Sequence, residues 1–335
     1  MKPGVYEGLC RFAYDQIDAV NWSSLKHVLQ SPAHARAVVE ERESKDVDRA
    51  VRQAFADGDA IHACCLEPDR WEADYIRPPS VYKGRVEIRG KRGSWSVVHL
   101  DGAHQDQVFT SKSDAQKHAL EWRIEGVPHM AFRTRDEAKS ALAESYVGKT
   151  FVTAERQALA VSCRDAVLAH RLAGPALRAA LQAKSTELTC VWRDEATGLL
   201  CKARLDAVSD IDGEPCVWDL KSTRDARPES FSRDAGRYQY YGQFAYYANG
   251  YEQACKQGGS PLPAYLRVGA VAVEKTRPYG VFVYLVGPKT WDAGDFLWRS
   301  ALAVWSGCEK SGEWPGYSQD EPHVLDIPSY YYGRV

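Results

Sequence analysis

The chain has 335 residues, of which 44% are hydrophobic and 26% are charged, a composition typical of a globular protein with a sizeable core. Its formal net charge of -2 excludes a general attraction to nucleic acid, so a basic DNA-binding surface would have to be local. The nine cysteines form no C-x-x-C pair, and their odd number and irregular spacing argue against a secreted disulfide framework. No signal peptide and no apolar run of membrane-spanning length is visible. We therefore expect a cytoplasmic protein with reduced thiols and no membrane partner.

Helical signals dominate the first part of the chain. Residues 21–40 predict two short helices, the first capped by Ser23 or Ser24 and the second beginning at Pro32. The apolar periodicity of residues 46–66 predicts a longer helix.

The segment that follows differs in character from the rest of the chain. Residues 75–93 are polar and rich in basic side chains, and residues 94–124 predict a small β-β-α unit, with SWSVVHL and VFT as strands and SDAQKHALEWR as the helix. The sequence AFRTRDEAKSAL (131–142) is similar to VFTSKSDAQKHAL (108–120), as a short repeat or as a coincidence of helix-start chemistry. We interpret residues 86–145 as an inserted module.

The second half predicts an alternation of helices and strands. Helices are expected at 153–170, 174–184, 238–256 and 288–309, and strands at 187–193, 199–208, 216–222, 265–274 and 279–286. Helices, a run of strands, and then a helix with more strands indicate an α/β (α+β) fold with a central mixed β-sheet flanked by helices.

The strands around Asp212-Gly213 carry the most informative pattern. This dipeptide favours a two-residue hairpin turn, and the resulting register places Asp206 opposite Asp219 and Arg204 opposite Lys221. Apolar residues then share one face of the hairpin, and the charged residues share the other. The charged face comprises Lys202, Arg204, Asp206, Asp219 and Lys221.

Directly opposed carboxylates lie about 4.5–5.5 Å apart at Cβ and repel each other. A divalent cation bound by Asp206 and Asp219 would remove this repulsion, and oxygen ligands suit Mg²⁺ or Mn²⁺. Lys221 lies about 6.6 Å along the strand from Asp219, which leaves room for a water or a scissile phosphate. The alternative is a solvated face on which Arg204 pairs with Asp206, and Asp219 with Lys221.

The preceding strand adds one more candidate. If residues 194–197 form the loop, Glu187 falls opposite Arg204. Glu187 is then either a second carboxylate for a metal or a water, or one half of a plain Glu–Arg cross-strand pair.

Asp206, Asp219 and Lys221 resemble the motif of the PD-(D/E)xK nucleases, and within them the exodeoxyribonuclease VIII and lambda-exonuclease-like enzymes. The helix that follows contains Gln243 and Tyr247, which match a Q-x-x-x-Y pattern of that family. The segment GDAIHACCLEPD is similar to a further family pattern and implies that His62 is a metal ligand or its neighbour. Without the family, His62, Gln243 and Tyr247 could equally be packing residues.

The resemblance covers roughly residues 1–78 and 148–335, which we expect to form a discontinuous nuclease core around the 86–145 module. NWSSLKHVLQSPAHAR resembles the family's DNA-entry helices, and EWPGY with LDIPSY resembles its C-terminal end. Ser24, Lys26 and Arg36 could bind a terminal phosphate, with Arg204 as a further DNA contact; solvated surface is the alternative. Leu205 stands where the motif has a proline, which is not a ligand.

The resemblance implies a Mg²⁺-dependent DNA exonuclease, for which Mn²⁺ can substitute, acting on double-stranded ends in recombination or DNA processing. Asp206, Asp219 and the Leu220 carbonyl would bind metal, and Lys221 would activate the attacking water. It also implies a homo-oligomer and a single-strand annealing protein as partner. Only Cys255 and Cys308 lie late in the chain, so no iron–sulfur cluster is expected. A structure-specific or restriction-type endonuclease and a non-catalytic DNA-binding or assembly module remain alternatives.

Overall fold

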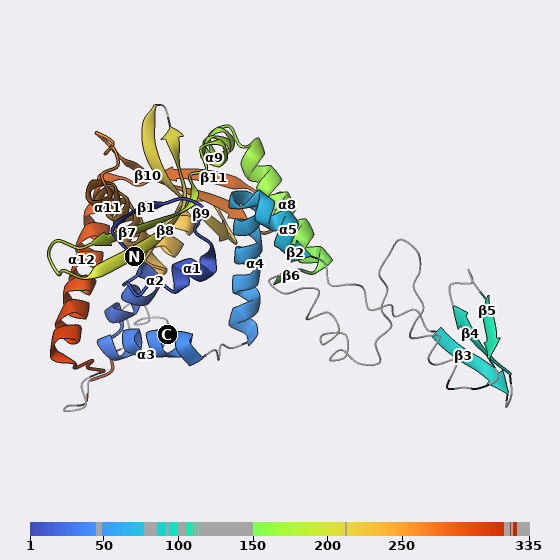
Figure 1. Cartoon of the computed structure of the whole chain (residues 1–335). Coiled ribbons are helices and arrows are strands. Elements are labelled where there is room, and N and C mark those ends of the chain that lie inside the picture. The colour runs from blue at the N-terminus through green and yellow to red at the C-terminus, as the bar shows by residue number, and fades with distance from the viewer. Residues whose placement is uncertain are drawn as a thin grey trace, which may run out of the picture. The chain divides into compact units, whose positions relative to one another are not determined.

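The computed structural model describes residues 1–44, 49–76, 86–91, 94–99, 105–109, 111, 113, 150–211, 213–317, 322 and 324–326. The chain divides into two compact units (Figure 1), one formed by Met1–Leu66 with Val161–Val335 and the other by Glu67–Ala160. The expected boundaries, 1–78 with 148–335 around an 86–145 module, stay a prediction.

The larger unit is an assembly of helices around one sheet. Its helices are α1 (Arg11–Asp15), α2 (Trp22–Leu25), the 3-10 helix η1 (Lys26–Leu29), α3 (Pro32–Ser44), α4 (Arg49–Leu66), most of α8 (Ala154–Ala169), α9 (Ala173–Gln182), α10 (Pro228–Arg237), α11 (Tyr240–Gly258) and α12 (Pro288–Ser311). Its strands are β1 (Gly4–Tyr6), β7 (Thr186–Arg193), β8 (Leu200–Ile211), β9 (Glu214–Thr223), β10 (Arg267–Glu274) and β11 (Val281–Leu285). The helices and strands expected in the second half are confirmed to within three residues at each end.

The six strands form one mixed sheet in the order β1-β7-β8-β9-β10-β11. Strands β9 and β10 pair in parallel, whereas the other neighbours pair antiparallel. A parallel pair needs a long crossover connection, and α10 and α11 supply it between β9 and β10. The predicted α/β (α+β) fold with a mixed sheet flanked by helices is therefore confirmed.

The β8–β9 register agrees with the sequence. Ala207 pairs with Trp218 and Ile211 with Glu214, which is the register that the Asp-Gly turn predicts. Gly213 adopts a φ of +80°, a left-handed conformation that glycine reaches without strain. Asp212 itself lies outside the described residues.

The β7–β8 register differs from the expected one by two residues. Thr189, not Glu187, pairs with Arg204, so Glu187 lies level with Asp206. The connecting loop is longer than predicted because the buried carboxylate of Asp194 accepts hydrogen bonds from the Thr197 amide, at 2.8 Å, and from the Thr197 hydroxyl, at 2.7 Å. A shift of two residues keeps every side chain on its expected face.

Helices cover both faces of the sheet, as successive residues of β10 show. Ala270 packs in a cluster with Phe244 of α11, whereas Val271 lines a small apolar cavity together with Val167 of α8 and Leu177 of α9. Helices α11 and α12 lie side by side (Figure 1). The charged side chains Lys202, Arg204 and Asp219 of β8 and β9 are thus held in the interior.

Two glycines determine how closely α11 approaches its neighbours. A Cβ atom on Gly242 would come within 2.3 Å of the Trp22 ring, and one on Gly250 within 2.5 Å of the Trp192 ring. Both indoles are buried in the main core. The close packing of α11 against these rings fixes the positions of Gln243 and Tyr247, which lie between the two glycines in the sequence.

The smaller unit is built from short elements. It contains α5 (Pro68–Asp74), the start of α8, a parallel pair of β2 (Tyr75–Ile76) with β6 (Thr150–Phe151), and an antiparallel sheet of β3 (Val86–Lys91), β4 (Ser94–His99) and β5 (Gln105–Phe109). Trp71 and Tyr75 stack with ring centroids 4.9 Å apart. Strand β3 was not expected, although Val86 and Ile88 alternate with charged residues. Apart from Ser113, the expected 113–123 helix lies outside the described residues, as does all of the segment 131–142.

The N-terminal helices begin close to their expected positions. Pro32 begins α3 as predicted, but neither predicted serine caps α2. Asn21 does so instead, because its side-chain oxygen accepts a hydrogen bond from the Ser24 amide at 2.9 Å. None of the helices in the described part of the chain combines the length and apolar character that a membrane crossing requires.

Candidate active site

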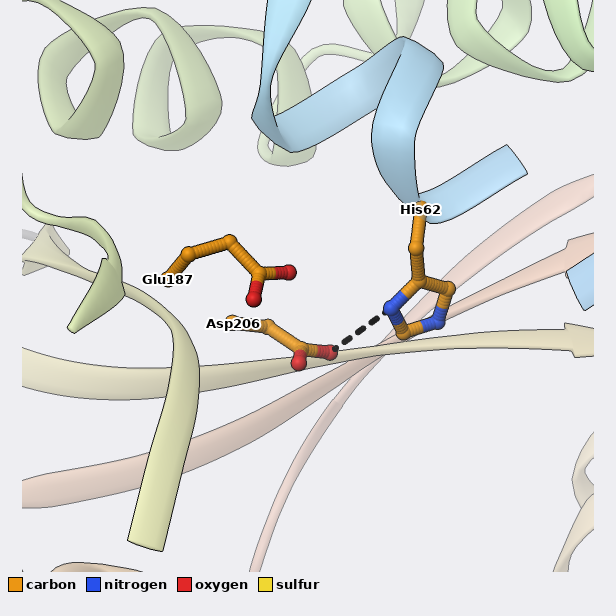
Figure 2. Close-up of side chains that lie close together, drawn as sticks. All are labelled: His62, Glu187 and Asp206. Atoms are coloured by element: carbon orange, nitrogen blue, oxygen red, sulfur yellow. Dashed lines mark ion pairs between the residues drawn. The ribbon is translucent and has the colours of Figure 1, made fainter. Parts of the chain in front are cut away.

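Three side chains from separate elements converge beside the sheet. His62 comes from α4, Glu187 from β7 and Asp206 from β8, and one potential ligand atom of each lies within 4.8 Å of the others (Figure 2). The Nδ1 atom of His62 is 3.8 Å from Oδ2 of Asp206. Backbone pairing of β7 with β8 on both sides of this position, Thr186 with Ala207 and Leu188 with Leu205, holds the carboxylates of Glu187 and Asp206 level with each other.

Asp206 is the centre of this cluster. Its Oδ2 atom accepts a hydrogen bond of 2.6 Å from the amide of Leu220, and the side chain is 13% exposed. Burial, the largest cause, and the nearby carboxylates of Asp219 and Glu187 together raise the pKa of Asp206 to about 7, against the opposing effects of His62 and Lys221. A carboxylate whose ionised form is this unfavourable gains from a cation close by.

Asp219 and Lys221 form a second, connected group. Their side chains make an ion pair, and Gln243 of α11 joins both: its amide nitrogen donates to Asp219 Oδ1 at 3.0 Å, and Lys221 donates to its oxygen at 3.2 Å. Tyr247, one turn further on, hydrogen bonds with Gln243, and burial raises its pKa well above the usual value. Of the two residues predicted from the sequence, Gln243 therefore contacts the Asp219–Lys221 pair directly, and Tyr247 contacts Gln243.

The ammonium group of Lys221 stays charged in this buried setting. Burial lowers the pKa of Lys221, but the carboxylates of Asp219 and Asp206 outweigh that effect and leave the pKa raised. Its Nζ also lies 4.8 Å from the centroid of the Tyr240 ring, a cation–π contact. A charged lysine can orient a water or stabilise negative charge on a phosphate, whereas it cannot accept a proton.

Glu187 is held in an unusual backbone conformation. Its φ is +51°, a left-handed conformation that costs a residue with a side chain about 1–3 kcal/mol, and its carboxylate makes an ion pair with the buried Arg204. The Glu–Arg pair that the sequence predicted is present, but it comes from this distorted strand end and not from direct cross-strand opposition. Such strain is typical of functional sites.

The donor set of the cluster fits a single divalent cation. Two carboxylates and one imidazole are ligands that Mn²⁺ and related ions accept, and His62, Glu187 and Asp206 would hold such an ion. Asp219 does not belong to this group of three, and its carboxylate contacts Lys221 and Gln243. Metal binding by Asp219 and by the carbonyl of Leu220 stays a prediction.

Two of the four residues suggested for DNA binding are buried. Ser24 is 4% and Arg204 is 7% exposed, so neither offers its side chain to a phosphate in this conformation. Lys26 lies half-buried on η1. Arg36 is exposed and pairs with Glu40 at 2.8 Å, one turn along the same helix. A DNA contact remains a prediction for Lys26 and Arg36.

Several residues near the site were not found from the sequence. Lys202 donates to the carbonyls of Tyr14, at 2.9 Å, and Ile17, at 2.7 Å, and so ties the end of α1 to β8. The charge of Arg11 interacts with Glu187. The alternation of charges along β8 indicated the face of Lys202, but nothing in the sequence brings residues 11–17 to this strand.

Comparison with known proteins assigns the chain to a family. The sequence matches the family model described as a PDDEXK-like domain of unknown function (DUF3799) over residues 21–321. No curated protein matches. Among solved structures, a protein of Eubacterium rectale, named an exonuclease by inference, is similar with a TM-score of 0.35 and 14% sequence identity. The match covers 60% of this chain and 74% of the Eubacterium rectale chain. The protein SSO0001 is similar with a TM-score of 0.23 and 13% identity over 50% and 70%, respectively. Because the family model spans most of its length, the chain belongs to the PDDEXK-like family DUF3799, within the PD-(D/E)xK superfamily.

Proposed function

We propose that this protein is a metal-dependent deoxyribonuclease that hydrolyses phosphodiester bonds from double-stranded DNA ends. Membership of a nuclease-like superfamily supports a nuclease-type activity. The observation that carries the proposal is the convergence of His62, Glu187 and Asp206 next to the Asp219–Lys221 pair. An ion-binding cluster beside a buried, charged lysine is an arrangement that can activate a water and stabilise the negative charge that develops on a phosphate during hydrolysis.

Each side chain has a distinct task in this proposal. His62, Glu187 and Asp206 would hold Mg²⁺, for which Mn²⁺ could substitute, with Asp219 and the Leu220 carbonyl as further ligands. The ion, when bound, makes water more acidic and neutralises charge on the phosphate. Lys221 orients the attacking water, and Gln243 and Tyr247 keep Lys221 and Asp219 in place.

The setting of the activity is also a proposal. We infer a role in DNA recombination or processing, as a homo-oligomer that works with a single-strand annealing protein. A cytoplasmic location is supported by the nine cysteines, all of them free and eight of them buried, because free thiols persist in a reducing compartment.

Digestion of a linear DNA duplex, with Mg²⁺ and with EDTA, tests the activity. We expect the wild-type protein to release nucleotides only with the metal, and Lys221→Ala to be slower by at least about a hundredfold. Lys256→Ala is the matched control, since Lys256 is an exposed lysine paired with Glu195. Equal digestion by wild type and Lys221→Ala, with both folded by circular dichroism, would remove the mechanism.

Covalently closed circular DNA distinguishes the two modes of cutting. An exonuclease leaves the circle intact and degrades it only after linearisation. Cutting of the intact circle would replace the exonuclease proposal with a structure-specific or restriction-type endonuclease of the same fold.

A further inference from the structure

Two tyrosines at the corner between α10 and α11 form a path from the surface to the candidate active site. Tyr238 directly follows α10 as its C-cap residue, and Tyr240 begins α11. Gln239 between them adopts a left-handed φ of +59°, which costs about 1–3 kcal/mol for such a residue. This turn brings the two rings together, with centroids 5.7 Å apart and planes tilted by 31°.

The inner ring is explained by packing, but the outer ring is not. Tyr240 is half-buried against Phe231 and Phe244, with centroids 6.2 and 6.4 Å away. Its ring is also 4.8 Å from the ammonium of Lys221. Tyr238 remains 48% exposed. An exposed aromatic ring is ordinary when isolated, but this one adjoins a ring that contacts the proposed catalytic lysine.

The charge around the outer ring suits a nucleic acid. The guanidinium carbon of Arg237 lies 5.5 Å from the centroid of the Tyr238 ring, and Arg237 is exposed at the end of α10. An exposed aromatic ring beside a cation is a combination that binds single strands, since the base stacks and the cation meets the backbone phosphate.

We propose that Tyr238 stacks on an unpaired nucleobase of a DNA end and so positions the adjacent phosphodiester near Lys221, with Tyr240 as the inner neighbour. This inference rests on the proposed nuclease function and specifies its substrate as a DNA strand whose terminal base is unpaired. Stacking on an aromatic side chain discriminates little between bases. The Tyr238 ring, which we call the stacking platform, should therefore accept any base.

Binding without hydrolysis tests the platform directly. A duplex with a short unpaired tail carries 2-aminopurine in that tail, and the full-length protein is added in EDTA. We expect quenching of 2-aminopurine fluorescence by the wild type. Tyr238→Ala should abolish the quenching and weaken binding about tenfold, within the roughly 5–150-fold range that a stacked base contributes. Tyr238→Trp should retain both. Tyr265→Ala is the matched control, since Tyr265 is an exposed tyrosine of another loop.

A tail with an abasic residue provides the second arm. The abasic tail should weaken wild-type binding by the same factor as Tyr238→Ala and should not weaken Tyr238→Ala further. An unchanged affinity and unchanged quenching in Tyr238→Ala would overturn the inference, even if Mg²⁺- and Lys221-dependent digestion is found. Tyr238-dependent quenching without any digestion would instead keep the platform and remove the nuclease assignment.

Discussion

Replacing Asp206 by asparagine should stabilise the metal-free protein while it weakens metal binding. Burial and the neighbouring carboxylates raise the pKa of Asp206 from 3.8 to about 7, so ionising it costs up to roughly 4 kcal/mol at pH 8, at 1.36 kcal/mol per pKa unit. Relaxation of the protein reduces this penalty, and we expect a gain of about 2 kcal/mol in the free energy of unfolding for Asp206→Asn. The asparagine oxygen can still accept the hydrogen bond from Leu220.

The dependence on pH identifies the cause. Because the folded-state pKa is raised, the folded protein holds an extra proton between about pH 4 and pH 7, and its stability falls as the pH rises through that window. The gain from Asp206→Asn should therefore be about 2 kcal/mol at pH 8 but only about 1 kcal/mol at pH 5. Thermal unfolding in EDTA, followed by tryptophan fluorescence, should show a Tm increase of about 4–8 °C at pH 8 and half of that at pH 5.

The control is Asp292→Asn, an exposed aspartate on α12, for which no such increase is expected. A decrease in Tm for Asp206→Asn at pH 8 would mean that the folded protein stabilises the charged form of Asp206. An equal change at both pH values would mean that the change does not depend on the protonation of Asp206. Either result would refute the electrostatic explanation.

Three further substitutions test other parts of the structure. Gly250→Ala should destabilise the protein by about 1–3 kcal/mol through its clash with Trp192, seen as a lower Tm; an unchanged Tm would show that α11 is not closely packed there. Lys202→Met should cost about 2–4 kcal/mol, because it leaves buried carbonyls without their donor, and urea unfolding measures this; a loss below about 0.5 kcal/mol would contradict the role of Lys202. His62→Ala should weaken Mn²⁺ binding at least about tenfold in calorimetry, and wild-type affinity should increase from pH 6 to pH 8 as Asp206 loses its proton; equal affinities would exclude His62 as a ligand.

The register of the central hairpin could be predicted because local chemistry determines it. A turn that favours Asp-Gly fixes the pairing of β8 with β9, and the alternation of apolar residues confirms it. The β7–β8 register was wrong by two residues because its loop depends on one buried side chain, Asp194, whose hydrogen bonds with Thr197 lengthen it. The alternation of apolar and polar residues along a strand does not determine the length of the loop. A register shift by an even number of residues nevertheless leaves each side chain on its expected face of the sheet.

Less of the candidate site than of the hairpin could be predicted from the sequence. The hairpin pattern treats the charged face as open to solvent, yet Lys202, Arg204 and Asp219 are all at most 7% exposed, because helices cover both faces of the sheet. The cluster of three ligand atoms depends on α4 approaching the distorted end of β7, which is a long-range contact. The contact between Tyr240 and Lys221 likewise depends on the crossover helix returning over β9.

The charges buried along β8 and its neighbours have a consequence for how the protein would attract a polyanion. Cationic and anionic side chains are equal in number there, namely Lys202, Arg204 and Lys221 against Glu187, Asp206 and Asp219. This interior is electroneutral by formal count, so a divalent ion would give it an excess of two positive charges with no contribution from surface cations. Affinity for DNA should then respond more to the supply of divalent ions than to monovalent salt, unlike that of proteins that neutralise many phosphates with surface lysines and arginines.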